Sequence, residues 1–212
     1  MIKFIYADDL AGNSVLAKTM FRDRATQFSA RLKWDVRVDE HGYERDQYDA
    51  LNPMYVIWQQ PNGTHGGSMR IMPTIGRTMV NEHFTHLTDG VTITSPLIWE
   101  CTRFCIAPSA ADQGAKIAGA VMLAGHELGL RFGLESSVGV FDHRMRRIYK
   151  SIGWEPEVIG CAGEGRDRIC VGLWPFATEI RTKIAAQAGF AEDQGAKWFE
   201  ASFAPNSTAI AA

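Results

Sequence analysis

The sequence lacks the long apolar segment that a membrane-spanning protein needs. None of its apolar runs approaches the roughly 18 residues required to cross a bilayer. Asp8 and Asp9 interrupt the N-terminal stretch too early for a signal peptide. We therefore expect a cytoplasmic protein without stable membrane association. A net charge of −2 over 212 residues provides no broad basic field, so nucleic-acid binding is not expected either.

Cysteine is scarce, and its spacing does not suggest a metal centre. The chain contains only Cys101, Cys105, Cys161 and Cys170, and no two of them form a C-x-x-C pair. Gaps of three and eight residues between neighbours do not resemble a structural zinc site. We expect four buried free thiols and no metal site.

The chain also lacks the short motifs of several common enzyme sites. No G-x-G-x-x-G follows a strand pattern, and neither a P-loop nor a G-x-S-x-G nucleophile elbow is present. A dinucleotide site and a Rossmann-type methyltransferase site are therefore unsupported. The same holds for a phosphate-binding P-loop and an α/β-hydrolase triad.

What the sequence does contain is a mixed succession of strand and helix patterns. Strands are predicted at residues 2–6, 54–60, 66–72, 97–107, 134–140, 154–159 and 168–174. Helices are predicted at residues 13–31, 112–131, 142–152 and 177–189, and the polar residues 34–53 are typical of an ordered loop. Hairpins come first and βαβα units follow, which predicts one α/β domain over residues 1–200. The small and polar residues 201–212 are expected to form a frayed tail.

Three charged residues lie inside predicted strands, close to large aromatic residues. Arg70 lies in SMRIMPT, and Glu100 and Arg103 lie in WECTRFC. Buried strands rarely carry such charges unless the charges pair or serve a site. An ion-pair network and an active site remain equally open on these residues. Because side chains alternate along a strand, Glu100 and Arg103 can serve one cleft only if the strand carries a bulge or a sharp twist between them.

Charged and aromatic residues of the first half match a known family in order and spacing. They are Arg24, Phe28, Trp34, Asp46, Asp49, Arg70, Phe84, Glu100 and Arg103. With the flanking stretches RDRATQFSARLKW and ERDQYDALNPMYV, they resemble the LuxI-type acyl-homoserine-lactone synthases over about residues 1–107. A second stretch, RRIYKSIGWEPE at 146–157, resembles GCN5-related N-acetyltransferases. The resemblance implies their shared single-domain fold, a mixed twisted sheet with helices packed on both faces.

The resemblance also implies a reaction, in which this acyltransferase would make a quorum-sensing signal. The α-amine of S-adenosylmethionine attacks an acyl thioester, and the product closes to a lactone with release of methylthioadenosine. The acyl donor is either an acyl carrier protein thioester or a coenzyme A thioester, and no cofactor is expected beyond these substrates. The acetyltransferase loop Q/R-x-x-G-x-G/A is replaced here by CIAPSAADQGAKIAG. Two alternatives stay open: a GCN5-related N-acyltransferase acting on another amine, and a non-catalytic S-adenosylmethionine-binding domain.

The family pattern assigns expected roles to the matched residues. Glu100 is the candidate general base, directly or through water, and Arg103 is a catalytic or carboxylate-binding partner. S-adenosylmethionine binding is expected at Arg24, Phe28, Trp34, Asp46, Asp49 and Arg70. Arg70 is also a candidate for an ion-pair network with Asp46 or Asp49, and Phe84 is favoured as an apolar anchor in a polar loop.

The second half supplies candidates for the acyl chain and its carrier. An apolar acyl pocket is expected to be lined by Trp99, Met122, Val140, Phe141, Leu173 and Trp174, each of which is also an ordinary core residue. Where 3-oxo-preferring relatives often carry threonine, this chain has Phe141 or Asp142, which argues against a 3-oxo preference. A bulky Phe141 that fills the tunnel would suit a short, branched or aryl acyl group. Carrier docking is expected on one basic helix face, for which a simple solvated surface is the alternative. That face consists of Arg144, Arg146, Arg147 and Lys150.

Overall fold

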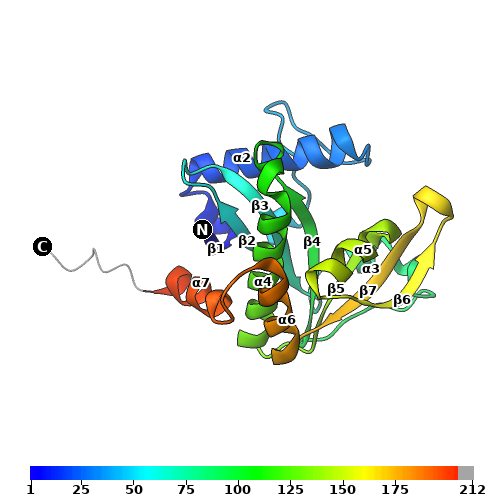
Figure 1. Ribbon diagram of the computed structural model, residues 1–212. Helices are drawn as coiled ribbons and strands as arrows, with labels where there is room; N and C mark the ends of the chain where they lie inside the picture. The colour runs from blue at the N-terminus through cyan, green and yellow to red at the C-terminus, as the bar shows by residue number, and fades with distance from the viewer. Residues whose placement is uncertain (205–212) are drawn as a thin grey trace, which may run out of the picture.

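The computed structural model describes residues 1–204, which form a seven-stranded sheet covered by helices (Figure 1). The strand order is β1-β2-β3-β4-β5-β7-β6, and all neighbours are antiparallel except β4 and β5. The strands are β1 (Ile2–Tyr6), β2 (Met54–Gln59), β3 (His65–Pro73), β4 (Ile98–Ile106), β5 (Ser136–Asp142), β6 (Glu157–Ala162) and β7 (Ile169–Pro175). Each of the predicted strands is present, and the mixed sheet of the expected fold class is confirmed.

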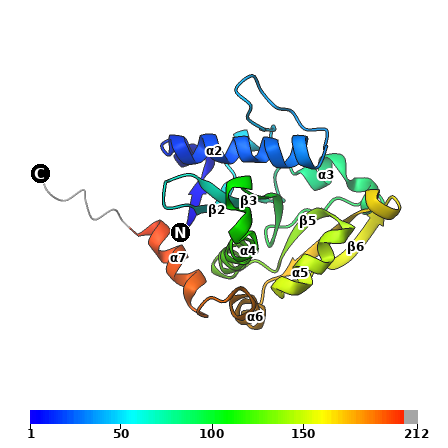
Figure 2. The same cartoon turned by 45° about the horizontal axis from the view of Figure 1, so that its top comes forward.

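Helices pack on both faces of this sheet, as Figure 2 shows. The first face carries α1 (Ala7–Leu10), α2 (Ser14–Ala25) with its π-helical continuation η1 (Thr26–Arg31), and α3 (Met79–His83). The second face carries α4 (Gly114–Arg131), α5 (Arg146–Ile152), α6 (Thr178–Ala188) and α7 (Gln194–Phe203). Short 3-10 turns connect them: η2 (Asp49–Leu51), η3 (Thr85–Leu87), η4 (Pro108–Gln113), η5 (His143–Met145) and η6 (Gly165–Asp167).

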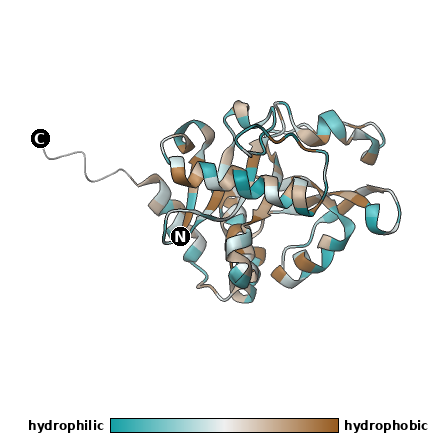
Figure 3. Cartoon of the chain, turned by 90° about the horizontal axis from the view of Figure 1, so that it is seen from above, coloured by the Kyte–Doolittle hydropathy of each residue, from teal (hydrophilic) through white to brown (hydrophobic). Residues whose placement is uncertain are grey.

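Side-chain alternation along the strands divides the core between the two faces. On β2, Met54 and Val56 join the core under α4, whereas Tyr55 and Ile57 pack against α1 and α2. Figure 3 looks onto the α2 side, where hydrophobic colours follow the strands beneath the helix. Residues on the same face of neighbouring strands are therefore brought together, however far apart they lie in the sequence.

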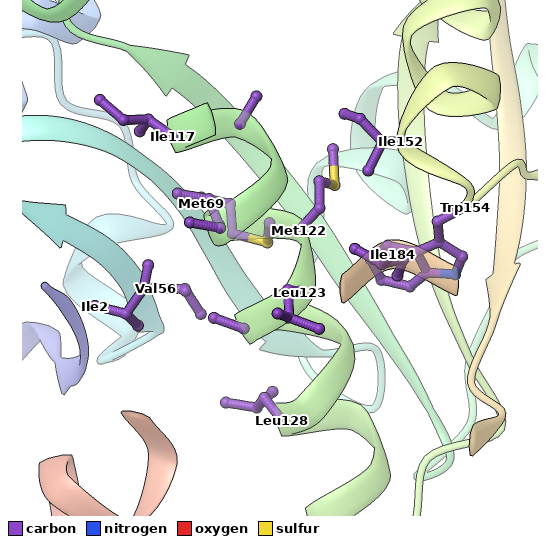
Figure 4. Packing of buried hydrophobic residues seen from close by; sticks show 14 of the residues in the cluster. Ile2, Val56, Met69, Ile117, Met122, Leu123, Leu128, Ile152, Trp154 and Ile184 are labelled. Carbon is purple, nitrogen blue, oxygen red and sulfur yellow. The ribbon is translucent and has the colours of Figure 1, made fainter. Parts of the chain in front are cut away.

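Helix α4 is the centre of the larger core. Its apolar residues face β2 and β3 on one side and α5 and α6 on the other, and Met122 extends toward Ile152 (Figure 4). Gly125 allows the helix to approach the sheet, since an added Cβ there would lie 2.8 Å from the Met69 sulfur. Within residues 1–204, no helix has both the length and the apolar character needed to cross a membrane.

The C-terminal helix α7 was not predicted from the sequence. It packs against β1, where Phe4 lies 5.2 Å from Phe199 between ring centroids. The Phe4 amide also donates a hydrogen bond to the Ser202 hydroxyl at 3.2 Å. The predicted frayed tail therefore begins too early, because residues 201–203 complete α7. The part of that tail at residues 205–212 lies outside the described residues.

The expectation of four free thiols is wrong for one pair. Cys161 on β6 and Cys170 on β7 are register partners and form a disulfide. The reason is the hairpin register, which a linear gap of eight residues does not reveal. Cys101 and Cys105 are free thiols, as predicted.

Candidate active site

A bulge in β4 organises the polar part of the first face. Between Arg70 and Ser68, β3 advances two residues while β4 advances three, from Thr102 to Cys105. Arg103 is part of this bulge, and its φ of 55° lies in the left-handed region that non-glycine residues rarely adopt. The sequence required a bulge or a sharp twist if Glu100 and Arg103 were to serve one cleft, and this prediction is confirmed.

Asp49 is the centre of a buried charge cluster. Its carboxylate accepts hydrogen bonds from Nη1 and Nη2 of Arg24, both at 3.0 Å, and from Nη1 of Arg70 at 2.8 Å. The Tyr55 hydroxyl donates to it at 2.5 Å, and the Asp46 amide donates at 2.9 Å. The predicted pairing of Arg70 with this carboxylate is therefore confirmed.

Glu44 and Asp46 complete the cluster by linking it to Arg103. Arg24 Nε lies 2.6 Å from Glu44, while Arg103 Nη2 lies 3.0 Å from Glu44 and 2.8 Å from Asp46. Arg70 pairs with Asp46 through Nη2 at 2.9 Å. Three guanidinium groups thus face three carboxylates, which leaves the cluster with no net formal charge.

The cluster has an inner and an outer end. Arg24, Arg70 and Glu44 are at most 1% exposed, whereas the side chains of Arg103 and Asp46 are 9% and 12% exposed. The Nε, Nη1 and Nη2 atoms of Arg24 are already engaged by Glu44 and Asp49. Among residues 1–204, by contrast, Arg103 Nη1 meets only the Met79 thioether, a weak acceptor. Arg103 is therefore the cation of the cluster that is best placed to meet a ligand.

The electrostatics of the cluster follow from its burial and pairing. Burial disfavours an ionised Asp49, but the guanidinium groups of Arg24 and Arg70 outweigh that desolvation and hold the pKa of Asp49 well below its ordinary 3.8. Burial likewise lowers the pKa of Arg24, and the charges of Asp49 and Glu44 reverse this effect and raise it. Asp49 and Arg24 are therefore both ionised at neutral pH.

Glu100 lies on the same face, and its carboxylate binds the N-terminus of α3. The Val80 amide donates to Oε1 at 2.6 Å, and the Met79 amide donates to Oε2 at 3.1 Å. Burial raises the pKa of Glu100, and these two N–H groups, followed by the charges of Arg70 and Arg103, act in the opposite direction. Each carboxylate oxygen retains a second acceptor site after these bonds.

Phe28 and Trp34 form a stacked pair at the outer end of the cluster. Their ring centroids are 5.1 Å apart with 5° between the planes, and the Arg103 guanidinium carbon lies 5.6 Å from the Phe28 centroid. Phe28 is buried, while Trp34 is 46% exposed. The predicted aromatic pair is therefore brought to Arg103, with Trp34 on the solvent side.

The predicted acyl-pocket residues do not line a single space. Trp99, Met122, Phe141 and Trp174 pack in the α4 core, whereas Val140 and Leu173 lie on the other face with Val80 and Val138. Grouping all six was wrong because adjacent residues such as Val140 and Phe141 point to opposite sides of the sheet. Phe84 packs against the same smaller core as Val140, which supports its prediction as an apolar anchor.

The basic helix face is present and exposed. Arg144, Arg146, Arg147 and Lys150 all lie on the surface of η5 and α5. Arg144 is neutralised by Asp142, to which its Nε donates at 2.9 Å. Arg146, Arg147 and Lys150 form no ion pair with any residue in the described part of the chain. They leave a positive surface next to the end of β5.

Several residues of the cluster escaped the sequence analysis. Glu44 accepts from two arginines, the Tyr55 hydroxyl donates to Asp49, and Thr102 accepts from Arg70 Nε at 3.0 Å. Alternation gave a usable signal for Tyr55 and Thr102, because both are register partners of Arg70 and share its face. Glu44 lies in an irregular loop and offered no such signal.

Comparison with known proteins identifies the family of this chain. Residues 8–184 match the autoinducer synthase family. An acyl-homoserine-lactone synthase from Rhizobium etli is 39% identical over 183 residues, which cover 84% of this chain and 86% of the relative. The chain belongs to the autoinducer synthase family. The predicted family, and with it an acyltransferase of the acyl-homoserine-lactone synthase class, is confirmed.

Solved structures confirm the fold of this autoinducer synthase. The CoA-dependent acyl-homoserine lactone synthase BjaI, determined with SAM and isopentyl-CoA, has a TM-score of 0.79 at 22% identity, covering 90% of each chain. An acyl-CoA N-acyltransferase from Pseudomonas aeruginosa has a TM-score of 0.53 at 12% identity and covers 82% of this chain and 97% of that one. At these identities the likeness concerns the fold, which is the acetyltransferase-like fold that the sequence predicted.

Proposed function

We propose that this autoinducer synthase acylates the α-amine of S-adenosylmethionine from an acyl thioester and then closes the homoserine lactone. In the first step the amine nitrogen forms a bond to the thioester carbon, and the thiol leaves. In the second step a carboxylate oxygen of the adenosylmethionine attacks its own γ-carbon, and methylthioadenosine leaves. The protein must therefore hold two substrates so that the amine of one meets the carbonyl of the other.

The observation that carries the proposal is the divergence of β4 from β5 beside the charge cluster. The two strands pair in parallel only over Ile98–Glu100 and Ser136–Val138. Beyond Glu100 the two strands no longer pair but separate (Figure 1), and the bulge at Arg103 lies in this part of β4. Beside this separation the charge cluster lies on one face of the sheet, and the core of α4 and α5 lies on the other. This arrangement suits a reaction in which a polar amine substrate and an apolar acyl chain approach from opposite faces.

The outer end of the cluster suits S-adenosylmethionine. Arg103 keeps a guanidinium nitrogen free of strong acceptors, and a guanidinium binds a carboxylate in a two-pronged geometry. Trp34 stacks on Phe28 through one ring face and leaves the other for an adenine ring or a sulfonium. Arg24 and Arg70 hold Asp49, Glu44 and Asp46 in place behind this end, and we assign them to positioning.

Glu100 is the candidate base for the first step. Both of its carboxylate oxygens are occupied by α3 amides, so we propose that it accepts the amine proton through a bound water at a remaining lone pair. Backbone N–H groups of β4 beyond Glu100, where its pairing with β5 ends, are candidates for stabilising the oxyanion that forms on the thioester carbonyl. These two contributions place deprotonation and charge stabilisation on the same strand.

The α4–α5 face favours a small acyl group. Phe141, Tyr149 and Trp174 pack edge to face with centroid distances of 5.1–5.5 Å, and each is less than 10% exposed. These rings fill the space that a long chain would need on this side. We propose a short, branched or aryl acyl group, delivered on coenzyme A or on acyl carrier protein at the basic surface of α5.

The test is a product assay with purified protein, S-adenosylmethionine and two donor libraries, one on coenzyme A and one on acyl carrier protein. An acyl-homoserine lactone appearing together with methylthioadenosine in the mass spectrum supports the proposal. Acylated amines without lactone would instead indicate a general N-acyltransferase, and binding without turnover would indicate a non-catalytic domain. Arg103→Lys keeps the charge and is expected to weaken adenosylmethionine binding, whereas the exposed Arg37→Lys is the matched control.

A further inference from the structure

Two cysteines and a histidine, side chains of types that can bind a metal ion, lie close together where β5 ends beside β7 and β6. Cys161 and Cys170 face each other across β6 and β7, and His143 is the first residue after β5. Their Sγ and ring nitrogen atoms all lie within 4.8 Å of one another, with Cys170 Sγ 3.7 Å from His143 Nδ1. In this structure the two cysteines form a disulfide. None of the three residues belongs to the arginine–carboxylate cluster.

Strand register, rather than the disulfide, holds the three side chains together. Cys170 on the central β7 pairs with Cys161 on one side and with Phe141 of β5 on the other. His143 follows Phe141 by two residues, at the start of η5, and its Nδ1 lies 3.7 Å from Cys170 Sγ. The His143 amide also donates to the Arg168 carbonyl at 3.0 Å, which fixes the chain after β5 to the start of β7. Reducing the disulfide would therefore leave two thiols and an imidazole side by side.

Two thiolates and an imidazole are a ligand set for thiophilic divalent ions such as Zn²⁺. A dithiol reductant breaks the S–S bond, gives two cysteine thiols and is itself oxidised to a disulfide. Binding of the ion then displaces the two thiol protons. Cys170 is fully buried, but Cys161 and His143 are half-buried, so an ion can reach them from solvent.

We propose that the reduced protein binds one thiophilic divalent ion through Cys161, Cys170 and His143, with a water molecule as fourth ligand. The disulfide is the oxidised form of the same site, and it excludes the ion because its sulfurs are bonded to each other. The proposal departs from the sequence-based expectation of free thiols without a metal. Since His143 leads directly into η5 and α5, the ion would lie at the base of the basic surface.

The test is a titration of the full chain with Co²⁺ under anaerobic conditions, after reduction with a phosphine. Reduced protein is expected to bind one Co²⁺ with a thiolate-to-cobalt charge-transfer band and the visible bands of tetrahedral cobalt, both removed by Zn²⁺. Cys161→Ser should abolish the charge-transfer band, while Cys101→Ser should keep it. His143→Gln should weaken Co²⁺ binding by about tenfold or more.

The disulfide form supplies a control that needs no substitution. Oxidised wild-type protein has the same fold and should show no charge-transfer band. The proposal is overturned if reduced protein with all four thiols titratable shows no band, or if the band survives in both Cys161→Ser and Cys170→Ser. The titration contains no substrate, so its result is independent of whether the chain makes acyl-homoserine lactones.

Discussion

Asp49→Asn is the substitution that tests the charge cluster most directly. It preserves the size of the side chain but removes one of three carboxylates, leaving three guanidinium groups against Glu44 and Asp46. The new amide group also presents hydrogen-bond donors toward Arg24 and Arg70, which are themselves only donors. The variant therefore buries an uncompensated positive charge.

Breaking a buried pair by removing one partner costs about 3–5 kcal/mol. For a chain of this length, each kcal/mol lowers the melting temperature by roughly 2–4 °C. We therefore expect Asp49→Asn to melt roughly 6–20 °C below the wild type, measured by circular dichroism, with an unchanged urea m-value. Asp35→Asn, an exposed aspartate of the same loop, is the matched control and should stay within about 0.5 kcal/mol of the wild type.

The pH dependence of this difference provides a second measurement. The folded pKa of Asp49 is depressed below 3.8, so the unfolded chain takes up the proton first as the solution is acidified. Asp49 therefore contributes its full stabilising free energy above pH 3.8, and this contribution is lost as the pH falls through the lower pKa of the folded state. The stability gap between wild type and Asp49→Asn should be constant from pH 7 to pH 5 and narrow below pH 3.8. A variant that melts with the wild type at pH 7 would refute the account of a tightly paired cluster.

Three further predictions concern individual side chains. If Glu100 is the base, Glu100→Gln should lower the acylation rate by about 10²- to 10⁴-fold. The variant should also lose the limb of the kcat pH profile in which the rate rises as the base loses its proton. Full acylation by Glu100→Gln would show that Glu100 is not the base. Trp34→Ala should weaken adenosylmethionine binding in calorimetry by about 0.5–1.5 kcal/mol while leaving the melting temperature nearly unchanged, since the ring is 46% exposed. Burial, followed by the charge of Arg181, lowers the pKa of His126 to about 3, so stability should fall as the pH drops below 6.5, by roughly 2 kcal/mol at pH 5. His126→Gln, which keeps an acceptor near the Ala177 amide, should remove that acid-side loss in urea titrations; an identical pH profile would contradict it.

The sequence predicted the fold well because its strands are strongly patterned. The charged residues inside strands were the most informative signal, since a buried Arg70 or Glu100 requires partners wherever it lies. The bulge was expected only on the condition that Glu100 and Arg103 serve one cleft, because alternation otherwise points them to opposite faces. These inferences depend on local periodicity, which a single sequence displays directly.

The failures have different physical origins. The Cys161–Cys170 disulfide depends on how β6 pairs with β7, and a bulge between Val158 and Gly160 shifts that pairing by one residue. Glu44 depends on the path of an irregular loop, which no periodicity describes. The grouping of six residues into one acyl pocket was an avoidable error. Strand alternation, which the sequence shows directly, places the adjacent Val140 and Phe141 on opposite faces of the sheet.

The backbone at Arg103 argues that the cluster is more than a structural ion-pair network. Arg24 reaches the same carboxylates from a regular helix, and Arg70 reaches them from an unbulged position on β3, so neither needs unusual backbone. Arg103 instead adopts a φ of 55°, a conformation that costs on the order of 1–3 kcal/mol for a non-glycine residue. Pairing with Glu44 and Asp46 offsets that cost but does not explain it, because both carboxylates already have arginine partners. The bulge does explain one other feature: it directs a partly accessible guanidinium toward the Phe28–Trp34 pair, in the part of β4 that no longer pairs with β5.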